Sequence, residues 1–219
     1  MVNEDFPEAE IRQAGYNVVY SGQKTYNGVA ILSRMHARDV FAGIPGNDDP
    51  QRRVMAATVG KVRVVNVYVP NGQEVGSEKY RYKLDWLVKL EEYIQTELGE
   101  HHELALLGDF NIAPTDRDVH DPVLWRGKVL CSEPERKALQ ALVDVGLNDS
   151  FRKFEQEPES FTWWDYRAAA FRRNRGLRID HILCSDSLYT RCLACHVDKG
   201  PRKLERPSDH APVMAEFKG

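Results

Sequence analysis

Short apolar runs of four to eight residues recur along the whole chain. They are rich in Val, Ile and Leu, and Gly, Pro, Asn or Asp often bounds them, which is typical of β-strands. The runs predicted as strands are Asn17–Tyr20, Gly28–Ser33, Val54–Val59, Val62–Val69, Leu104–Leu107, Arg178–Cys184, Arg191–Val197 and Val213–Phe217.

Two longer segments carry apolar residues at three- and four-residue spacing, which predicts helices. The first spans Ser77–Leu98, and Gly99 is expected to end it. The second begins at the capping-box motif Ser132-Glu-Pro-Glu135 and is expected to end at Gly146. Eight strands and two helices favour packed sheets with helices outside them, an α/β class without a regular βαβ alternation.

The composition is that of an ordinary globular chain, since 42% of the 219 residues are hydrophobic and 29% are charged. The sequence has no repeat or linker, so we expect one domain over residues 1–219. The 30 basic and 33 acidic residues give a net charge of −3, so a nucleic-acid partner has to be argued from local patches.

Targeting signals are missing from the sequence. No apolar run approaches the ~20 residues of a membrane span, so we expect no membrane partner. The first ten residues lack the basic start and apolar stretch of a secretory signal. We therefore expect a cytoplasmic protein whose four cysteines are free thiols. The segment Cys192-Leu-Ala-Cys195-His196 matches the attachment pattern for c-type haem, but it alternates like a strand, and we expect no haem.

An acid and an amide follow the apolar run that ends at Leu107. Asp109 and Asn111 are two residues apart, and side chains at i and i+2 of a strand point to the same side. They are therefore expected to converge on one oxygen or one metal ion. The alternative is a plain turn at the end of a strand, since Asp and Asn both favour turns.

Two further acids lie near histidines. Asp209 and His210 stand between Pro207 and Pro212, where the carboxylate suits Mg²⁺ or Mn²⁺ and the imidazole can move protons. The alternative is a polar turn before the last strand. Asp180 lies inside an apolar strand, where an acid requires a partner. That partner is either a histidine that it orients or a nearby arginine. His181, on the opposite face, is taken as structural.

Phosphate-binding side chains occur in three segments. Tyr68 and Asn71 end a Val-rich strand, where they either donate to phosphate oxygens or form a core aromatic beside a turn. Residues 166–178 hold five arginines and no acid, directly after Trp163 and Trp164, and residues 199–206 add four cations against one acid. Arginines and aromatic rings together favour phosphate contact and base stacking. The alternative is a solvated loop with the tryptophans in the core. The five arginines are Arg167, Arg172, Arg173, Arg175 and Arg178.

Taken together, these motifs resemble the exodeoxyribonuclease III family of abasic-site endonucleases, within the wider DNase I-like endonuclease/exonuclease/phosphatase group. The resemblance runs along the whole chain. It is carried by Ser21–Arg34, Asn66–Gly72, Leu106–Asp116, Ser160–Arg167, Asn174–Ser185 and Arg206–Val213. It implies a four-layer α/β/β/α sandwich and Mg²⁺- or Mn²⁺-dependent hydrolysis of DNA phosphodiesters.

The resemblance also implies residue roles. Asp109 orients or deprotonates the attacking water, with Asn111 beside it at the metal and the scissile phosphate. Tyr68 contacts the phosphate, Asp180 and His210 form a carboxylate–imidazole pair, and Asp209 is a metal ligand. Whether Asp109 or His210 is the working base stays open. The resemblance implies that Asn71, Trp163 and Trp164 contact DNA, and the arginine-rich segment adds Arg172 and Arg173 as expected DNA contacts.

The chain departs from the family pattern at its start. Family members open with a strand, a helix and a second strand that ends in a metal-binding Glu, and the chain begins after that point. Glu4 and Asp5 match the loop that follows the ligand strand and are not expected to replace this Glu. We therefore expect an N-terminally incomplete domain that lacks its first strands, and we attribute the start to an internal methionine.

The expected function is that of a DNA-repair nuclease, a 3′→5′ exonuclease and abasic-site endonuclease that acts as a monomer on double-stranded DNA in the nucleoid. Two alternatives remain. One is a catalytically impaired DNA-binding fragment of the same family. The other is a phosphodiesterase of the wider group that acts on RNA or lipid.

Overall fold

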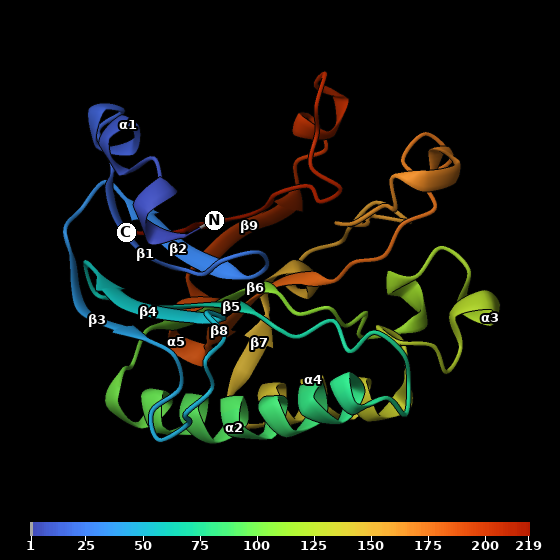
Figure 1. Ribbon diagram of the computed structural model, residues 1–219, viewed down its shortest axis with the longest axis horizontal. Helices are drawn as coiled ribbons and strands as arrows, with labels where there is room; N and C mark the ends of the chain where they lie inside the picture. The colour runs from blue at the N-terminus through green and yellow to red at the C-terminus, as the bar shows by residue number, and fades with distance from the viewer. Residues whose placement is uncertain (1) are drawn as a thin grey trace.

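Strands occupy the centre of the molecule in the computed structural model, which describes residues 2–219 (Figure 1). Six of them form a mixed sheet in the order β3-β4-β5-β6-β8-β7. β5 and β6 run parallel, and the other neighbours are antiparallel. The six strands are β3 (Ala37–Ala42), β4 (Val54–Val59), β5 (Val62–Tyr68), β6 (Leu104–Asp109), β7 (Leu147–Asp149) and β8 (Asp180–Ser185).

Two hairpins pack on one face of this sheet. The first consists of β1 (Asn17–Gly22) and β2 (Gly28–Ser33), and its Val29 and Ile31 are buried with Met55 of β4. The second consists of β9 (Cys192–Val197) and β10 (Val213–Phe217), and its Phe217 packs with Ala105 of β6. The second sheet of the predicted sandwich is thus present as two separate two-stranded sheets.

Helices α2 (Glu78–Glu100) and α4 (Glu133–Asp144) cover the opposite face of the six-stranded sheet (Figure 1). Leu90 and Ile94 of α2 and Leu142 of α4 are fully buried against the sheet. Burial of such a side chain contributes about 1.5 to 3 kcal/mol, so this apolar layer is a main source of stability. The predicted α/β class, with packed sheets and helices outside them, is confirmed.

The remaining helices are short and connect the strands. They are α1 (Glu8–Gln13), α3 (Pro122–Trp125), α5 (Asp186–Thr190) and the 3₁₀ turns Asn3–Asp5, Asp116–Asp118, Ser150–Lys153, Arg167–Ala169 and Pro201–Lys203. Within residues 2–219, none of the helices is long and apolar enough to cross a membrane.

Both predicted long helices and all eight predicted strands are present, but some boundaries differ. The capping box of α4 is confirmed, since Ser132 N–H donates to Glu135 and the Ser132 hydroxyl accepts in return. The prediction that Gly99 ends α2 is wrong, because the helix continues to Glu100 and the His101 N–H still bonds to the Glu97 carbonyl. The Glu97 side chain is paired with Arg63 of β5, which holds this last turn on the sheet.

Candidate active site

Three predicted site residues lie side by side on three adjacent strands. In the sheet register, Tyr68 of β5 is opposite Asp109 of β6, and Asp109 is opposite Asp180 of β8. Alternation along each strand turns all three side chains toward the face that carries the hairpins. Neighbouring strands are about 4.8 Å apart, so the register alone places a phenol and two carboxylates at one edge of the sheet.

His210 reaches the same edge from the loop before β10. Its Nδ1 bonds to both carboxylate oxygens of Asp180, at 3.1 and 2.9 Å. A ligand atom from each of Asp109, Asp180 and His210 lies within 4.8 Å of the other two. These three form the one group of three or more acids, histidines or cysteines with that spacing in the described part of the chain. They open into a cleft of about 440 Å³ that Pro212 and Val213 also line.

Burial and neighbouring charges shift the pKa values of Asp109 and His210. Burial, and next to it the negative charge of Asp180, raise the pKa of Asp109 to about 7. Burial alone would lower the pKa of His210, but the hydrogen bond and charge of Asp180, with Asp109 and Asp209 nearby, raise it to about 9. At neutral pH the imidazole is therefore cationic, and the Asp109 carboxylate is a base strong enough to accept a proton.

Asn111 is brought to Asp109 by a turn and not by strand alternation. β6 ends at Asp109, and Asn111 has the left-handed φ of 51°. Its backbone N–H donates to Oδ1 of Asp109 at 2.8 Å, and its side-chain amide donates to Oδ2 at 2.9 Å. Asp109 and Asn111 therefore do converge, as predicted. They are brought together by a turn after the strand, which was the alternative interpretation, and not by side-chain alternation within the strand.

His181 faces the other side of the sheet, as predicted. It is 2% exposed, its Nδ1 accepts from Arg178 at 3.0 Å, and its Nε2 donates to the Ile112 carbonyl at 2.9 Å. Burial and the charge of Arg178 lower the pKa of His181 to about 4, so it is neutral. Arg178 is itself buried and paired with Asp118 and Asp149, so it does not belong to the predicted exposed arginine patch.

The tryptophan pair divides into two roles. Trp163 is half-buried, and its indole N–H donates to Oδ2 of Asp209 at 3.0 Å. Asp209 therefore lies beside the cluster, and its assignment as a metal ligand stays a prediction. Trp164 is fully buried and donates to Asn174, so the prediction that it contacts DNA is wrong for this conformation. It fills the base of the loop, packed against Phe171.

The loops around this edge present cations to solvent. Arg172 and Arg173 are exposed, as their predicted DNA contact requires. Their loop stands next to the 199–206 loop (Figure 1), and the Tyr166 hydroxyl donates to the Pro207 carbonyl between the two. On the other side of the cluster, a cleft of about 760 Å³ beside Tyr68 and Asn71 is lined by Lys24, Arg53 and Lys79, among others.

The donor set fits a hard divalent cation. Asp109 and Asp180 offer carboxylate oxygens, which Mg²⁺ and Mn²⁺ prefer, whereas His210 could bind a metal only after its imidazolium loses a proton. Burial and, after it, repulsion from Asp180 raise the pKa of Asp109, and a cation between the two carboxylates would relieve that repulsion. The side-chain oxygen of Asn111 accepts from Asn71 at 3.0 Å, so its predicted place in the metal shell requires that bond to be shared or broken.

One residue that contacts this site, Lys83, was missed at the level of sequence. Lys83 donates to the backbone carbonyl of Asn111, and it forms an ion pair with Glu135. One signal could have found it, because Lys83 falls on the apolar stripe of its helix, between Tyr80 and Leu87. A lysine on a buried stripe needs a buried anion and further acceptors.

Comparisons with known proteins agree with this geometry. A model of the Endonuclease/Exonuclease/phosphatase family matches residues 2–210. Exodeoxyribonuclease III of Haemophilus influenzae is 38% identical over 231 residues, which cover 100% of this chain and 86% of that protein.

Solved structures are similar over the same extent. The 3′-5′ exonuclease NExo of Neisseria meningitidis has a TM-score of 0.98 at 51% identity, and a structure named as an AP endonuclease from Archaeoglobus fulgidus has a TM-score of 0.95 at 38% identity. Both matches cover 100% of this chain and 86% of the other. The chain therefore belongs to the Endonuclease/Exonuclease/phosphatase family, with relatives named exodeoxyribonuclease III and AP endonuclease, and it is a hydrolytic nuclease of the phosphodiesterase type.

Proposed function

We propose that the chain hydrolyses phosphodiesters of double-stranded DNA, removing nucleotides from 3′ ends and cutting at abasic sites. The observation that carries this proposal is the convergence of Asp109, Asp180 and His210, with Tyr68 in the adjacent register position. The names of the relatives support DNA as the substrate, since one structure holds a Neisseria 3′ phosphatase bound to a product DNA hairpin.

In this proposal the Asp109 carboxylate takes a proton from the attacking water, because Asn111 holds it in place and Asp180 is already paired with His210. The imidazolium of His210, which Asp180 orients, donates to a non-bridging phosphate oxygen as negative charge develops. Tyr68 and Asn71 donate to the same phosphate. The bond from phosphorus to water forms, and the bond from phosphorus to the leaving oxygen breaks.

Mg²⁺ or Mn²⁺ held by Asp109 and Asp180, with Asn111, Asp209 and His210 as further candidates, would supply positive charge to the phosphate oxygens. The exposed Arg172 and Arg173 and the half-buried Trp163 are proposed to hold the duplex beside the cleft. Lys24 and Lys79 line the cleft beside Tyr68 and Asn71, so cations lie at that cleft as well as at Arg172 and Arg173.

A nicking assay tests the proposal. Three hairpin duplexes are compared, one with a 3′-hydroxyl, one with a 3′-phosphate and one with an internal tetrahydrofuran site, each with Mg²⁺, with Mn²⁺ and with EDTA. We expect cleavage that EDTA abolishes. The 3′-phosphate arm addresses a second activity, which the neighbour named as a 3′ phosphatase at 50% identity favours.

The same assay separates the alternatives. An RNA hairpin of the same sequence and a phosphoinositide are included as substrates. Salt-dependent duplex binding without metal-dependent cleavage in any arm would contradict the proposal and identify a DNA-binding fragment. Faster hydrolysis of RNA or of the phosphoinositide would identify a different phosphodiesterase of the same family.

A further inference from the structure

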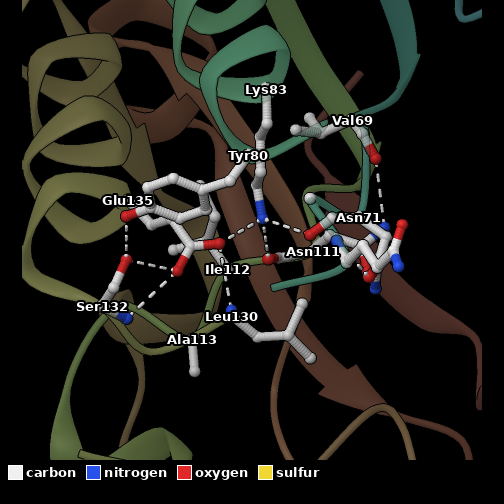
Figure 2. A network of polar contacts seen from close by, with 12 residues as sticks. Val69, Asn71, Tyr80, Lys83, Asn111, Ile112, Ala113, Leu130, Ser132 and Glu135 are labelled. Atoms are coloured by element: carbon white, nitrogen blue, oxygen red, sulfur yellow. Dashed lines mark hydrogen bonds and ion pairs between the residues drawn. The ribbon is translucent and has the colours of Figure 1, made fainter. Parts of the chain in front are cut away.

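A fully buried ammonium lies directly behind the proposed active site (Figure 2). The side chain of Lys83 extends from α2 toward the Asn71 and Asn111 turns. Its Nζ donates to the backbone carbonyl of Asn111 at 2.7 Å and to that of Asn71 at 3.2 Å. The third contact of Nζ is Oε1 of Glu135, at 2.5 Å. One side chain therefore joins the helix layer to two turns that each carry a predicted site residue.

Glu135 is fixed independently of Lys83. Its Oε1 also accepts from the Leu130 N–H at 3.0 Å, and its Oε2 accepts from the N–H and hydroxyl of Ser132 at 3.1 and 2.5 Å. The Tyr80 hydroxyl in turn contacts Ser132 at 2.6 Å. The carboxylate of Glu135 is therefore held in place and determines where the ammonium of Lys83 lies. Lys83 in turn holds the backbone carbonyls of Asn71 and Asn111.

The Asn111 turn is closely coupled to the site. Asn111 has a left-handed φ of 51°, a conformation that asparagine adopts more readily than other side-chain-bearing residues. Its side chain links Asn71 to Asp109, at 3.0 and 2.9 Å. The stem of Lys83 also supports the first turn, because a Cβ on Gly72 would lie 3.1 Å from Cδ of Lys83. A shift of Lys83 therefore reaches the Asp109 carboxylate through a single residue.

A second buried ion pair on the same helix provides the comparison. Arg63 of β5 pairs with Glu97 near the far end of α2, at 2.5 Å, and the two side chains are 5% and 9% exposed. Arg63 also donates to the Asp39 carbonyl. Both pairs are buried and both tie α2 to another element, but only Lys83 contacts residues of the site. A buried ion pair is weak evidence that a residue is kept for stability. The contacts of Lys83 with the Asn71 and Asn111 carbonyls indicate a role in positioning the site.

We propose that Lys83 and Glu135 are positioning residues of the nuclease reaction, which hold the Asn71 and Asn111 turns so that Asn111 orients Asp109. This inference rests on the proposed function for its kinetic consequence and on the contacts above for its geometry.

Kinetics of matched variants test the inference. Lys83→Met keeps the length of the stem and removes the donor, and Arg63→Met is the control that breaks the other pair. We expect Lys83→Met to lower kcat about 10- to 100-fold with KM within about threefold of wild type, since small displacements in an active site cost rates of this order. We expect Arg63→Met to keep kcat within about threefold at a similar loss of Tm.

Two further variants separate positioning from folding. The double variant Lys83→Met/Glu135→Gln removes both charges, so it should regain Tm relative to Lys83→Met while kcat stays low. The conservative Glu135→Gln keeps an oxygen for the ammonium and should retain more of kcat than Lys83→Met. Recovery of both Tm and kcat in the double variant would overturn the inference, and so would equal kcat losses in Lys83→Met and Arg63→Met.

Hydrogen exchange gives a readout that needs no activity. In Lys83→Met, peptides covering residues 70–73 and 108–113 should exchange faster than in wild type, while Arg63→Met leaves them unchanged. Wild-type exchange in both peptides of Lys83→Met would overturn the inference. A wild-type chain that fails to cleave any DNA with metal would refute the proposed function, and the exchange measurement would still decide the positioning role.

Discussion

Two histidines, His181 of β8 and His210 of the loop before β10, lie on opposite sides of the same sheet, and at neutral pH one is neutral and the other cationic. His210 is paired with the Asp180 carboxylate at the cleft, and its pKa is raised to about 9. His181 follows Asp180 in sequence, points into the helix layer, and accepts from the Arg178 guanidinium, and its pKa is lowered to about 4. Alternation along one strand thus places an acid in the cleft and a neutral ring behind it.

The difference lies in the partner that each ring has. A carboxylate stabilises an imidazolium, whereas a guanidinium stabilises an imidazole that accepts a hydrogen bond. On the cleft side the outcome is a charged group available to a phosphate. On the buried side it is a fixed tautomer whose Nε2 donates to Ile112 and supports the turn after Asp109. The positive charge of His210 at the cleft favours activity, and the neutral state of His181 behind the sheet favours stability.

The largest expected effect is on the cleft side. Asp109→Asn should lower kcat about 10⁴-fold, because it removes both the proposed base and a carboxylate of the cation site. Its Tm should stay close to that of wild type, since relief of the repulsion from Asp180 offsets the loss of one acceptor for Asn111. Single-turnover cleavage and calorimetry would measure both values. A variant that loses Tm and activity together would break the contrast between the two sides.

The next largest effect is behind the sheet. Arg178→Met should lower the free energy of unfolding by about 4 kcal/mol, because Asp118, which is 1% exposed, loses its buried partner. Urea denaturation would measure this loss. At a temperature where the variant stays folded, kcat should remain within about tenfold of wild type. A variant of normal stability would show that the pairs of Arg178 with Asp118 and Asp149 are dispensable.

Asp180→Asn should have an intermediate effect. It leaves His210 without the charge that raises its pKa and removes a carboxylate of the proposed cation site, so kcat should fall about 100-fold, with little change in Tm. Asp149→Asn is the matched control, because Asp149 also pairs with a cation, Arg178, but behind the sheet. The control should lose Tm and keep kcat. If Asp180→Asn lost Tm and kept kcat, and Asp149→Asn lost kcat and kept Tm, the roles of the cleft side and the helix side of the sheet would be contradicted.

Much of this arrangement could be predicted from local patterns. Alternation correctly placed Asp180 and His181 on opposite faces, and the capping box correctly marked the start of α4. What failed depends on contacts distant in the chain. β3 was not predicted because it is an edge strand with mostly exposed residues. Trp164 was assigned to DNA because a sequence does not show which of two adjacent tryptophans the loop buries.

Lys83 shows the limit most clearly. Its position on the apolar stripe signals a buried lysine, but its acceptors are the carbonyls of residues 71 and 111 and the carboxylate of residue 135. No local pattern links these residues. The sheet register brings Tyr68 beside Asp109, and only then do the turns that follow the two strands meet above the helix.

The smallest expected effect is the pH dependence of stability that His181 contributes. Its folded pKa of about 4 is below the unfolded value near 6.5, so between these pH values the unfolded chain binds a proton that the folded chain excludes. Stability from this residue is complete above pH 6.5 and is lost as the pH falls toward 4, by about 2 kcal/mol at pH 5. His181→Gln keeps a donor for the Ile112 carbonyl but does not titrate.

Urea denaturation at pH 7 and pH 5 should therefore show that the free energy of unfolding falls by about 2 kcal/mol less in the variant than in wild type. Equal losses would mean that His181 is protonated in the folded state, and the contrast between the two histidines would no longer hold.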